Sequence, residues 1–353
     1  MTMDEIKKEL QKRKIQMLQL DPFGYCNARC WFCPVKYTPN PPEGRTHMPP
    51  ELLTKILDDL MEERNKPEGL VKEDFWFLYT AHYNEVLLYK HFGVLLENLR
   101  KHGLKTMVLS NGTPLTPEKT DLIREYQDVV IGICLNIPAF QADIWEKRTS
   151  FKKEKFENLI ENVSYAYTQL NQMVQAKTFS IQVNGIHQNS FKDAGGWVQP
   201  GENLPSDIDL DPAQGELATQ IKIAQELFPG MHIFEMSSLV DRSGFLAEQK
   251  VIENSSAIEK YFQPEHKKVT GCSNGQDTGG RLFGWLHVNA NGDAFLCCND
   301  YAFEHKFGNF KTQTLREIWR SDRHAEVIVH SLDTLCRKCV YATWEDVSPK
   351  NGS

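Results

Sequence analysis

Segments with strand character and segments with helix character alternate about six times between residues 15 and 240. The short apolar runs that we expect to form strands cover 15–21, 75–80, 105–112, 129–136, 178–186 and 231–240. Helical periodicity marks 48–63, 86–103, 116–126, 156–173 and 217–228, and a polar helix is expected over 1–14. This alternation predicts an α/β fold whose parallel sheet has helices outside it, as an open sheet or a full or partial barrel.

The alternation of strand and helix segments ends at about residue 265. Residues 285–300 alternate in hydropathy around an Asn-Gly dipeptide at 291–292, a pair that is typical of tight hairpin turns. Residues 314–332 have helical periodicity. We therefore expect two parts. Residues 1–264 form a core domain, a partial (β/α)6-type parallel barrel, and residues 265–353 form a small cysteine-rich module of a hairpin plus a helix.

Charge and hydropathy exclude several classes of protein. The formal net charge of -7 and the sequence pI of about 5.9 argue against a protein that neutralises nucleic-acid phosphates. No apolar run approaches the roughly 18–20 residues of a membrane helix, and the charged N-terminal stretch lacks the apolar region of a signal peptide. We expect a cytoplasmic protein with neither nucleic acid nor membrane as partner.

Eight of the nine cysteines are grouped toward the two ends of the chain, and Cys134 lies between the groups. Three lie within eight residues near the start, and five lie in the last quarter. An odd number of cysteines in a reducing compartment is a poor disulfide framework, and clustering of this kind indicates metal sites.

The first group, Cys26, Cys30 and Cys33, has the spacing C-x3-C-x2-C and directly follows the first predicted strand. In parallel α/β folds this position lies at the edge of the sheet where chemistry takes place. Three thiolates suit a cubane iron–sulfur cluster that keeps one iron open, and an open position distinguishes a catalytic metal centre from a structural one. The alternative is a zinc site that takes His47 or a distant residue as its fourth ligand.

With this motif the chain resembles the radical SAM superfamily over about residues 15–340. The resemblance implies a four-iron cluster that binds S-adenosyl-L-methionine at its open iron, and a reductant protein such as flavodoxin or ferredoxin that supplies the electron. The cofactor is then cleaved to a 5′-deoxyadenosyl radical, which abstracts a hydrogen from the substrate. Phe32, just before Cys33, matches the ring that packs near the adenine in this family.

The resemblance also suggests residues that bind the cofactor. Glu85 matches the acid of the family's Gly-Gly-Glu segment, although residues 82–84 replace the small glycines, and Glu85 could equally cap the following helix. Cys134 and Asn136 lie on the strand expected to contact the ribose, where Cys134 could instead be a small core residue. The remaining candidates, each also readable as an ordinary polar surface residue, are Gln182 and Asn184 on one strand face and Arg242 after the last strand.

The C-terminal cysteines resemble the family's twitch module, the shortened form of the SPASM extension, which carries one auxiliary four-iron cluster. The matching thiols are Cys272, Cys297 in a Gly-x4-Cys spacing, and the pair Cys336 and Cys339. Cys298 could take the place of Cys297, but adjacent strand residues face opposite sides, so both are not expected in one cluster. A structural zinc site is the alternative for four thiolates.

Three functions are compatible with these motifs. The first is a radical SAM oxidoreductase that oxidises or remodels a small polar metabolite with help from the auxiliary cluster. The second is a maturase or epimerase acting on a ribosomally made peptide, in which Cys298 donates the quenching hydrogen. The third is a non-catalytic zinc or iron–sulfur binding module, which would give no role to the strand–helix domain over residues 15–240. The polar stretch 187–215 is expected to be a loop or an insertion on the substrate side.

Overall fold

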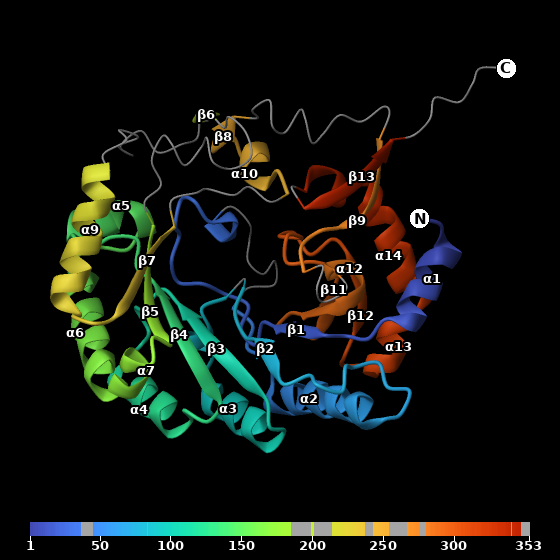
Figure 1. Ribbon diagram of the computed structural model, residues 1–353, viewed down its shortest axis with the longest axis horizontal. Coiled ribbons are helices and arrows are strands. Elements are labelled where there is room, and N and C mark those ends of the chain that lie inside the picture. The colour runs from blue at the N-terminus through green and yellow to red at the C-terminus, as the bar shows by residue number, and fades with distance from the viewer. Residues whose placement is uncertain are drawn as a thin grey trace.

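The computed structural model describes most of the chain. The described residues are 1–36, 45–82, 84–184, 199–200, 214–236, 243–253, 267–275, 280–339 and 341–346. The strands form one curved sheet, and helices α2, α3, α4, α6 and α9 cover its outer side (Figure 1). None of the described helices is both long and apolar enough to cross a bilayer.

Six parallel strands confirm the predicted strand–helix alternation. They are β1 (Met17–Leu20), β2 (Phe77–Tyr79), β3 (Lys105–Ser110), β4 (Val130–Asn136), β5 (Phe179–Asn184) and β7 (His232–Met236), adjacent in that order. Each neighbouring pair is parallel. Parallel neighbours require crossover connections, and here helices supply them on the outer face. The α/β fold with a mostly parallel sheet is therefore as the sequence predicts.

The helices follow the strands in alternation. The described helices before residue 250 are α1 (Met3–Lys12), α2 (Pro50–Asn65), α3 (Phe92–Lys101), α4 (Pro117–Glu125), α5 (Ala142–Thr149), α6 (Glu154–Gln169), α7 (Asn171–Gln175), α9 (Gln214–Leu227) and α10 (Phe245–Glu248). Helix α2 begins with Pro50 and α4 has Thr116 as its N-cap, and both residue types favour a helix start. These signals place the predicted helix starts within a few residues.

The hydrophobic core lies between the sheet and the outer helices. Each of the first five strands contributes a fully buried apolar side chain to it, namely Leu18, Leu78, Val108, Ile133 and Ile181. Burial of such a side chain contributes about 1.5–3 kcal/mol relative to exposure. Since side chains alternate along a strand, the intervening positions face the concave side of the sheet, where polar residues gather.

Three predicted helices differ from the structure at their boundaries. The predicted helix 86–103 is a 3₁₀ turn, η2 (Val86–Leu88), followed by α3 from Phe92. The break is held by Tyr89, whose hydroxyl donates to the Met48 carbonyl at 2.6 Å. The predicted 156–173 helix divides into α6 and α7. The predicted 314–332 helix divides into α13 (Leu315–Trp319) and α14 (Asp322–Asp333).

Short elements account for the other differences. Helix α14 starts anew because Ser321 caps it by accepting from the His324 amide. Helix α5 was not predicted, because its eight residues give too short a periodic signal. The predicted loop 187–215 lies almost entirely outside the described residues, as does the end of the predicted strand 231–240.

The C-terminal part continues the same sheet rather than forming a separate hairpin. Strand β10 (Trp285–Val288) pairs in parallel with β1, on the side away from β2. Strands β11 (Asp293–Phe295) and β12 (Lys306–Asn309) follow in antiparallel order and complete a nine-stranded sheet. The predicted hairpin turn is present between β10 and β11, with Gly292 at a φ of 81° that favours glycine. The division of the chain at residue 264 stays a prediction.

Further short elements complete the C-terminal part. Strand β9 (Lys267–Cys272) pairs with β13 (Ala342–Asp346) in a separate antiparallel ribbon that the sequence did not predict. A third small sheet pairs β6 (Gln199–Pro200) with β8 (Ile252–Glu253). The others are α12 (Arg281–Gly284) and the 3₁₀ turns η1 (Pro34–Lys36) and η4 (Cys336–Lys338).

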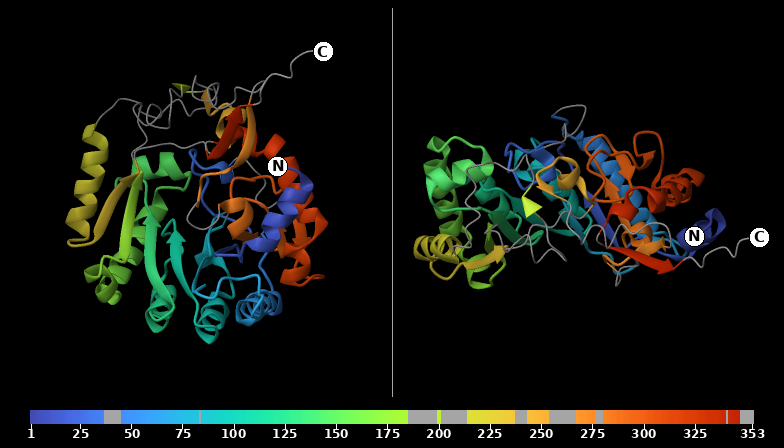
Figure 2. Two further views of the ribbon diagram at one scale, coloured as in Figure 1. Left: turned by 45° about the vertical axis from the view of Figure 1, so that its right-hand side comes forward. Right: turned by 90° about the horizontal axis from the view of Figure 1, so that it is seen from above.

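Besides the pairing of β10 with β1, helix packing and an ion pair join the C-terminal part to the N-terminal half of the chain. Helix α1 packs against α14, and Figure 2 shows the two side by side from both directions. Arg316 of α13 forms a two-pronged ion pair with Glu63 of α2, through Nε to Oε1 at 3.0 Å and Nη2 to Oε2 at 2.6 Å. Burial opposes ionisation of Glu63, but the hydrogen bonds from Arg316 and Lys66 outweigh it and lower its pKa.

Replacing Arg316 by Met should lower the free energy of unfolding by about 2 kcal/mol, because it leaves the buried Glu63 carboxylate short of its main partner. The expected loss is below the roughly 3–5 kcal/mol of a fully buried pair, since the Arg316 side chain is 43% exposed. Urea denaturation measures it. Because the pKa of Glu63 is depressed in the folded state, the difference should be present at neutral pH and shrink as the pH falls through that pKa.

Arg323 provides the matched control, since it pairs with Glu326 on the exposed surface of α14. Arg323→Met should change stability by less than about 0.5 kcal/mol. Equal losses in the two variants would mean that the Arg316–Glu63 contact does not stabilise the fold.

Candidate functional site

The loop after β1 carries the first thiol set, at the carboxyl end of the parallel strands. Cys26, Cys30 and Cys33 lie in this loop, and the Cys33 amide donates to the Cys30 carbonyl at 3.0 Å. Burial raises the pKa of all three thiols, to about 12 for Cys26. The negative charge of each neighbouring thiolate raises the pKa of Cys30 further. Three such thiolates are stable together only beside cationic charge, and the iron of a thiolate-bound cluster supplies it.

A cavity of about 320 Å³ opens next to this set. It brings together eight of the residues predicted from the sequence: Cys26, Cys30, Phe32, Cys33, Glu85, Cys134, Asn136 and Gln182. They come from the first loop, the segment after β2, and strands β4 and β5. Cys134, Asn136 and Gln182 face the cavity because they alternate with core residues along their strands.

Glu85 is almost fully buried in this cavity and makes two kinds of contact. Its side chain caps η2 by accepting from the Leu87 amide at 3.4 Å, as one of the two interpretations of the sequence expected. Its other oxygen accepts from the Asn111 amide at 2.8 Å. Burial raises the pKa of Glu85 to about 7, against the lowering effect of these hydrogen bonds. The ionised form of a buried carboxyl group is stabilised by a cationic group of a ligand, such as the amino group of an amino acid.

A chain of amide side chains lines the far wall. Gln182 donates to the Asn184 side chain at 2.9 Å, and Asn184 donates to the Asn136 side chain at 3.0 Å. Asn184 does not line the cavity but orients Asn136, which does. Burial raises the pKa of Cys134, so its thiol is protonated and suits a packing role at the wall. Arg242 lies outside the described residues.

The sequence did not single out Asn111, which is central to the geometry of the first site. Its side-chain amide lies 3.8 Å from the Cys26 sulfur and donates to the Asn27 side chain at 2.8 Å, while its backbone amide bonds Glu85. The only sequence signal was its place in a Ser-Asn-Gly turn directly after β3. Asn111 therefore fixes the first loop and Glu85 relative to each other.

Cys272, Cys297, Cys336 and Cys339 form the second thiol set. They come from the end of β9, the segment after β11 and the two ends of η4. Burial raises the pKa of Cys272 and Cys336, and raises that of Cys339 to about 12, and in all three the charge of Cys297 adds to the effect. The four thiols that the spacing predicted are thus close enough to interact.

Asn299 donates to two sulfurs of this set, through its backbone amide to Cys297 at 3.4 Å and its side chain to Cys339 at 3.5 Å. Hydrogen bonds to thiolate sulfurs are typical of iron–sulfur sites. Among the described residues, no group of three or more His, Cys, Asp or Glu side chains is arranged to hold a single metal ion. The assignment to clusters therefore rests on the two sets of thiols and on the family.

Cys298 is buried directly beside Cys297. Its sulfur accepts from the Arg281 guanidinium at 2.5 Å, and its hydrogen bond to Cys297, followed by burial, raises the pKa of Cys297. Cys298 lines neither cavity beside the thiol sets. Cys297 and Cys298 follow β11 and lie outside any strand, so the expectation that their side chains face opposite sides does not hold, and the choice between them as a cluster ligand stays a prediction.

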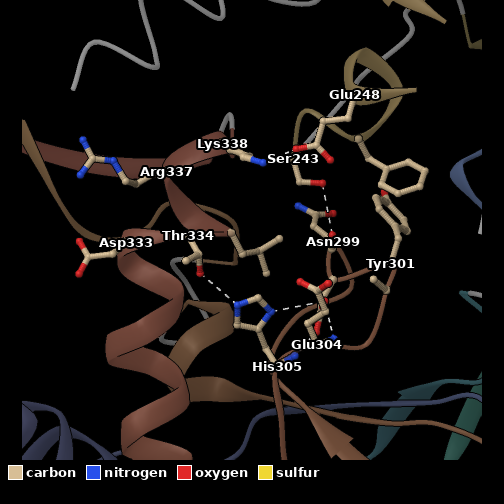
Figure 3. A pocket seen from close by; sticks show the side chains of 14 residues that line it. Ser243, Glu248, Asn299, Tyr301, Glu304, His305, Asp333, Thr334, Arg337 and Lys338 are labelled. Atoms are coloured by element: carbon tan, nitrogen blue, oxygen red, sulfur yellow. Dashed lines mark hydrogen bonds and ion pairs between the residues drawn. The ribbon is translucent and has the colours of Figure 1, made fainter. Parts of the chain in front are cut away.

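A second cavity, of about 510 Å³, lies beside the second thiol set (Figure 3). Figure 3 shows His305 pointing to Thr334, 3.2 Å from its hydroxyl, and Lys338 pointing to Glu248 across the cavity. The charged or titratable side chains of its lining are Glu248, Asp300, Glu304, His305, Asp333, Arg337 and Lys338. Tyr301 also lines this cavity and stacks on His82, which lines the first one. The two cavities therefore share a wall.

Comparisons with known proteins agree with this geometry. A family model described as the radical SAM superfamily matches residues 20–187, and a model named SPASM, an iron–sulfur cluster-binding domain, matches residues 280–340. The first match contains the Cys26 set, and the second contains all of the C-terminal set except Cys272. None of the curated proteins compared with the chain matches it significantly.

Solved structures share the fold at low sequence identity. Native anSMEcpe with bound AdoMet has a TM-score of 0.51 and 13% identity, over 92% of this chain and 86% of that one. SuiB of Streptococcus suis has a TM-score of 0.50 and 13% identity, over 90% and 68% of the two chains. BtrN in complex with AdoMet and 2-DOIA has a TM-score of 0.49 and 13% identity, over 94% of each.

The two family matches together cover both thiol sets except Cys272, and most of the described sheet, and the fold agrees with them. The chain belongs to the radical SAM superfamily, carries a C-terminal SPASM/twitch-type module, and has S-adenosyl-L-methionine and iron–sulfur clusters as its cofactors.

Proposed function

We propose that this radical SAM enzyme is an oxidoreductase that oxidises or remodels a small polar metabolite. A four-iron cluster held by Cys26, Cys30 and Cys33 would supply the electron for reductive cleavage of S-adenosylmethionine, and the 5′-deoxyadenosyl radical so formed would take a hydrogen from the substrate. The observation that carries the proposal is the first cavity, in which three thiols, a buried acid and a polar strand face meet. Flavodoxin or ferredoxin is proposed as the reductant.

The side chains of the first site have separate proposed roles. Cys26, Cys30 and Cys33 hold the cluster, and Phe32 packs against the adenine. Glu85 accepts a hydrogen bond from the amino group of the methionine part, where the buried carboxyl gains from a cation. The remaining cofactor contacts are assigned to the polar wall of the cavity, namely Cys134, Asn136, Gln182 and, through Asn136, Asn184, with Arg242 as a further candidate.

The second thiol set is proposed to hold the auxiliary cluster on Cys272, Cys297, Cys336 and Cys339. Four thiolates leave no open iron, so this cluster is suited to electron transfer rather than to binding the cofactor. Cys297 is preferred to Cys298 because its charge acts on the other three thiols, whereas the Cys298 sulfur accepts from Arg281.

The second cavity favours a small polar substrate. Its volume of about 510 Å³ lies within the roughly 300–1,000 Å³ typical of small-molecule sites. Its lining carries carboxylates and cationic groups together, which suits a molecule with several hydroxyl or amino groups. It adjoins the auxiliary thiols through Asn299 and shares the Tyr301–His82 wall with the first cavity. A substrate there would lie beside the proposed auxiliary cluster, with Tyr301 and His82 between it and the first cavity.

The alternative is a maturase or epimerase of a ribosomally made peptide, with Cys298 as hydrogen donor. The donor role stays a prediction, and the burial of Cys298 away from both cavities does not favour it. Faster 5′-deoxyadenosine formation with a small amino-polyol, and none with short peptides, would support oxidation of a metabolite. The reverse result would replace it with the maturase.

Anaerobically reconstituted protein should contain about eight irons per chain, if each thiol set holds a four-iron cubane. The Cys26→Ala, Cys30→Ala, Cys33→Ala triple variant should retain about half, because the C-terminal thiols are unchanged. Iron and zinc analysis measures both. Zinc in the triple variant in place of iron would contradict the auxiliary cluster.

Reduced protein supplied with S-adenosylmethionine should form 5′-deoxyadenosine slowly without substrate, and Cys30→Ala should abolish it because the open-iron cluster cannot assemble. Chromatography of the quenched reaction detects the product. Cys298→Ala is the matched cysteine control and should retain cleavage. A fully iron-loaded protein that leaves the cofactor intact would refute the proposed reaction.

Glu85→Gln should weaken binding of S-adenosylmethionine by about tenfold to a hundredfold, the cost of losing a charge-assisted hydrogen bond of about 1.5–3 kcal/mol. Glutamine keeps one acceptor oxygen, so it can accept from the Leu87 amide but no longer from the Asn111 amide as well. Isothermal calorimetry on the iron-loaded protein gives the dissociation constant. Unchanged affinity would leave Glu85 as a helix cap only.

A further inference from the structure

Arg281 is a buried cation at the centre of the C-terminal module. It is the first residue of α12, and only 9% of its surface is exposed. Its Nη1 donates to the Cys298 sulfur at 2.5 Å and lies 3.5 Å from Nε2 of His287. The guanidinium also lies over the Trp285 ring, 4.3 Å from the centroid. Its position is therefore fixed from three sides.

No carboxylate neutralises this cation within the part of the chain that the structure describes. The ion pairs found there do not include Arg281, and its buried Nε has no hydrogen-bond partner. A guanidinium stays charged in proteins, and a buried charge is normally paired. A buried cation that has no carboxylate partner and keeps an unused donor indicates that other negative charge is expected nearby.

The negative charge that faces Arg281 is that of the second thiol set. Its backbone amide donates to the Cys272 sulfur, and its side-chain charge acts on both Cys272 and Cys297. Arg281 thus lies beside two of the four proposed ligands of the auxiliary cluster.

His287 does not share this charge. It is fully buried, and burial, followed by the charge of Arg281, lowers its pKa well below the usual value. The imidazole is therefore neutral at physiological pH. Among the neighbouring side chains of Arg281, His287 and Cys298, Arg281 is therefore the one that carries positive charge.

We propose that Arg281 is a positioning residue that raises the reduction potential of the auxiliary cluster. The inference rests on the proposed ligation of that cluster by the C-terminal thiols. Reduction adds one negative charge to the cluster, and a fixed cation in a water-poor interior stabilises the more negative state. A higher potential favours acceptance of an electron, which is the direction that an oxidation of the substrate requires.

The test uses the full chain with Cys26, Cys30 and Cys33 replaced by Ala, so that the auxiliary cluster alone contributes to the signal. Arg281→Met removes the charge at similar length, and Arg281→Lys keeps the charge. Electron paramagnetic resonance during a redox titration at fixed pH measures the midpoint potential. Arg281→Met should shift it to a more negative value, and Arg281→Lys should remain nearer to the parent.

Two controls separate charge from other effects. Arg323→Met makes the same change in net charge on the exposed face of α14 and should leave the potential unchanged. Cys298→Ala keeps the guanidinium but removes its sulfur partner, and should shift the potential much less than Arg281→Met. An equal shift in Cys298→Ala would assign the effect to that sulfur and overturn the proposal.

Iron analysis accompanies every titration. An Arg281→Met variant with full iron and the parent potential would overturn the redox role. Loss of iron from both Arg281→Met and Arg281→Gln, with iron retained in Arg281→Lys, would also overturn the redox role. Arg281 would then be a structural residue. A parent protein without iron at the C-terminal thiols would instead refute the proposed cluster itself, so the two failures are distinguishable.

Discussion

The parallel pairing of β10 with β1 determines how the two ends of this chain meet. Met17 to Leu20 lie beside Trp285 to Val288 in register, although more than 260 residues separate them. The loop after β1 carries the first thiols, and the hairpin after β10 leads to Cys297. The first thiol set and Cys297 are therefore each reached from one of two adjacent strands, whereas Cys272, Cys336 and Cys339 come from β9 and η4.

Burial of seven thiols has an energetic consequence for folding. Burial raises the pKa of each thiol and mutual repulsion adds to it at several of them, so without cations the sites hold neutral thiols that lack strong partners. Iron removes the protons and supplies the positive charge, and binding free energy of that kind is also folding free energy. We expect the loops that carry the ligands, and not the sheet, to gain most order from cluster assembly. The sheet has its own continuous apolar core, which does not depend on iron.

The sequence predicted those features that depend on local spacing. The thiol sets could be read directly from the spacing of the cysteines. Side chains alternate between the two faces of a strand, so where Ile133 and Ile181 point into the core, Asn136 and Gln182 point to the face that carries the site. Asn111 and Arg281 could not be found in this way. Their roles depend on partners up to 85 residues away in the chain, which hydropathy and periodicity do not report. The pairing of β9 with β13 was missed for the same reason, since neither strand has a strong pattern and they are joined only by tertiary contact.

The two cluster sites are linked by packing as well as by the sheet. Val35, from the first loop, forms a small apolar cluster with Phe295 and Phe303, which flank the segment that carries Cys297. Cys26, Cys33 and Tyr301 pack against this cluster, and the Phe295 and Phe303 rings meet edge to face at 4.9 Å. Because protein interiors are close-packed, a displacement of either thiol-bearing segment must be felt by the other. The wall between the two cavities is built from the same segment through Tyr301, so the geometry of a substrate held there depends on both sites being assembled.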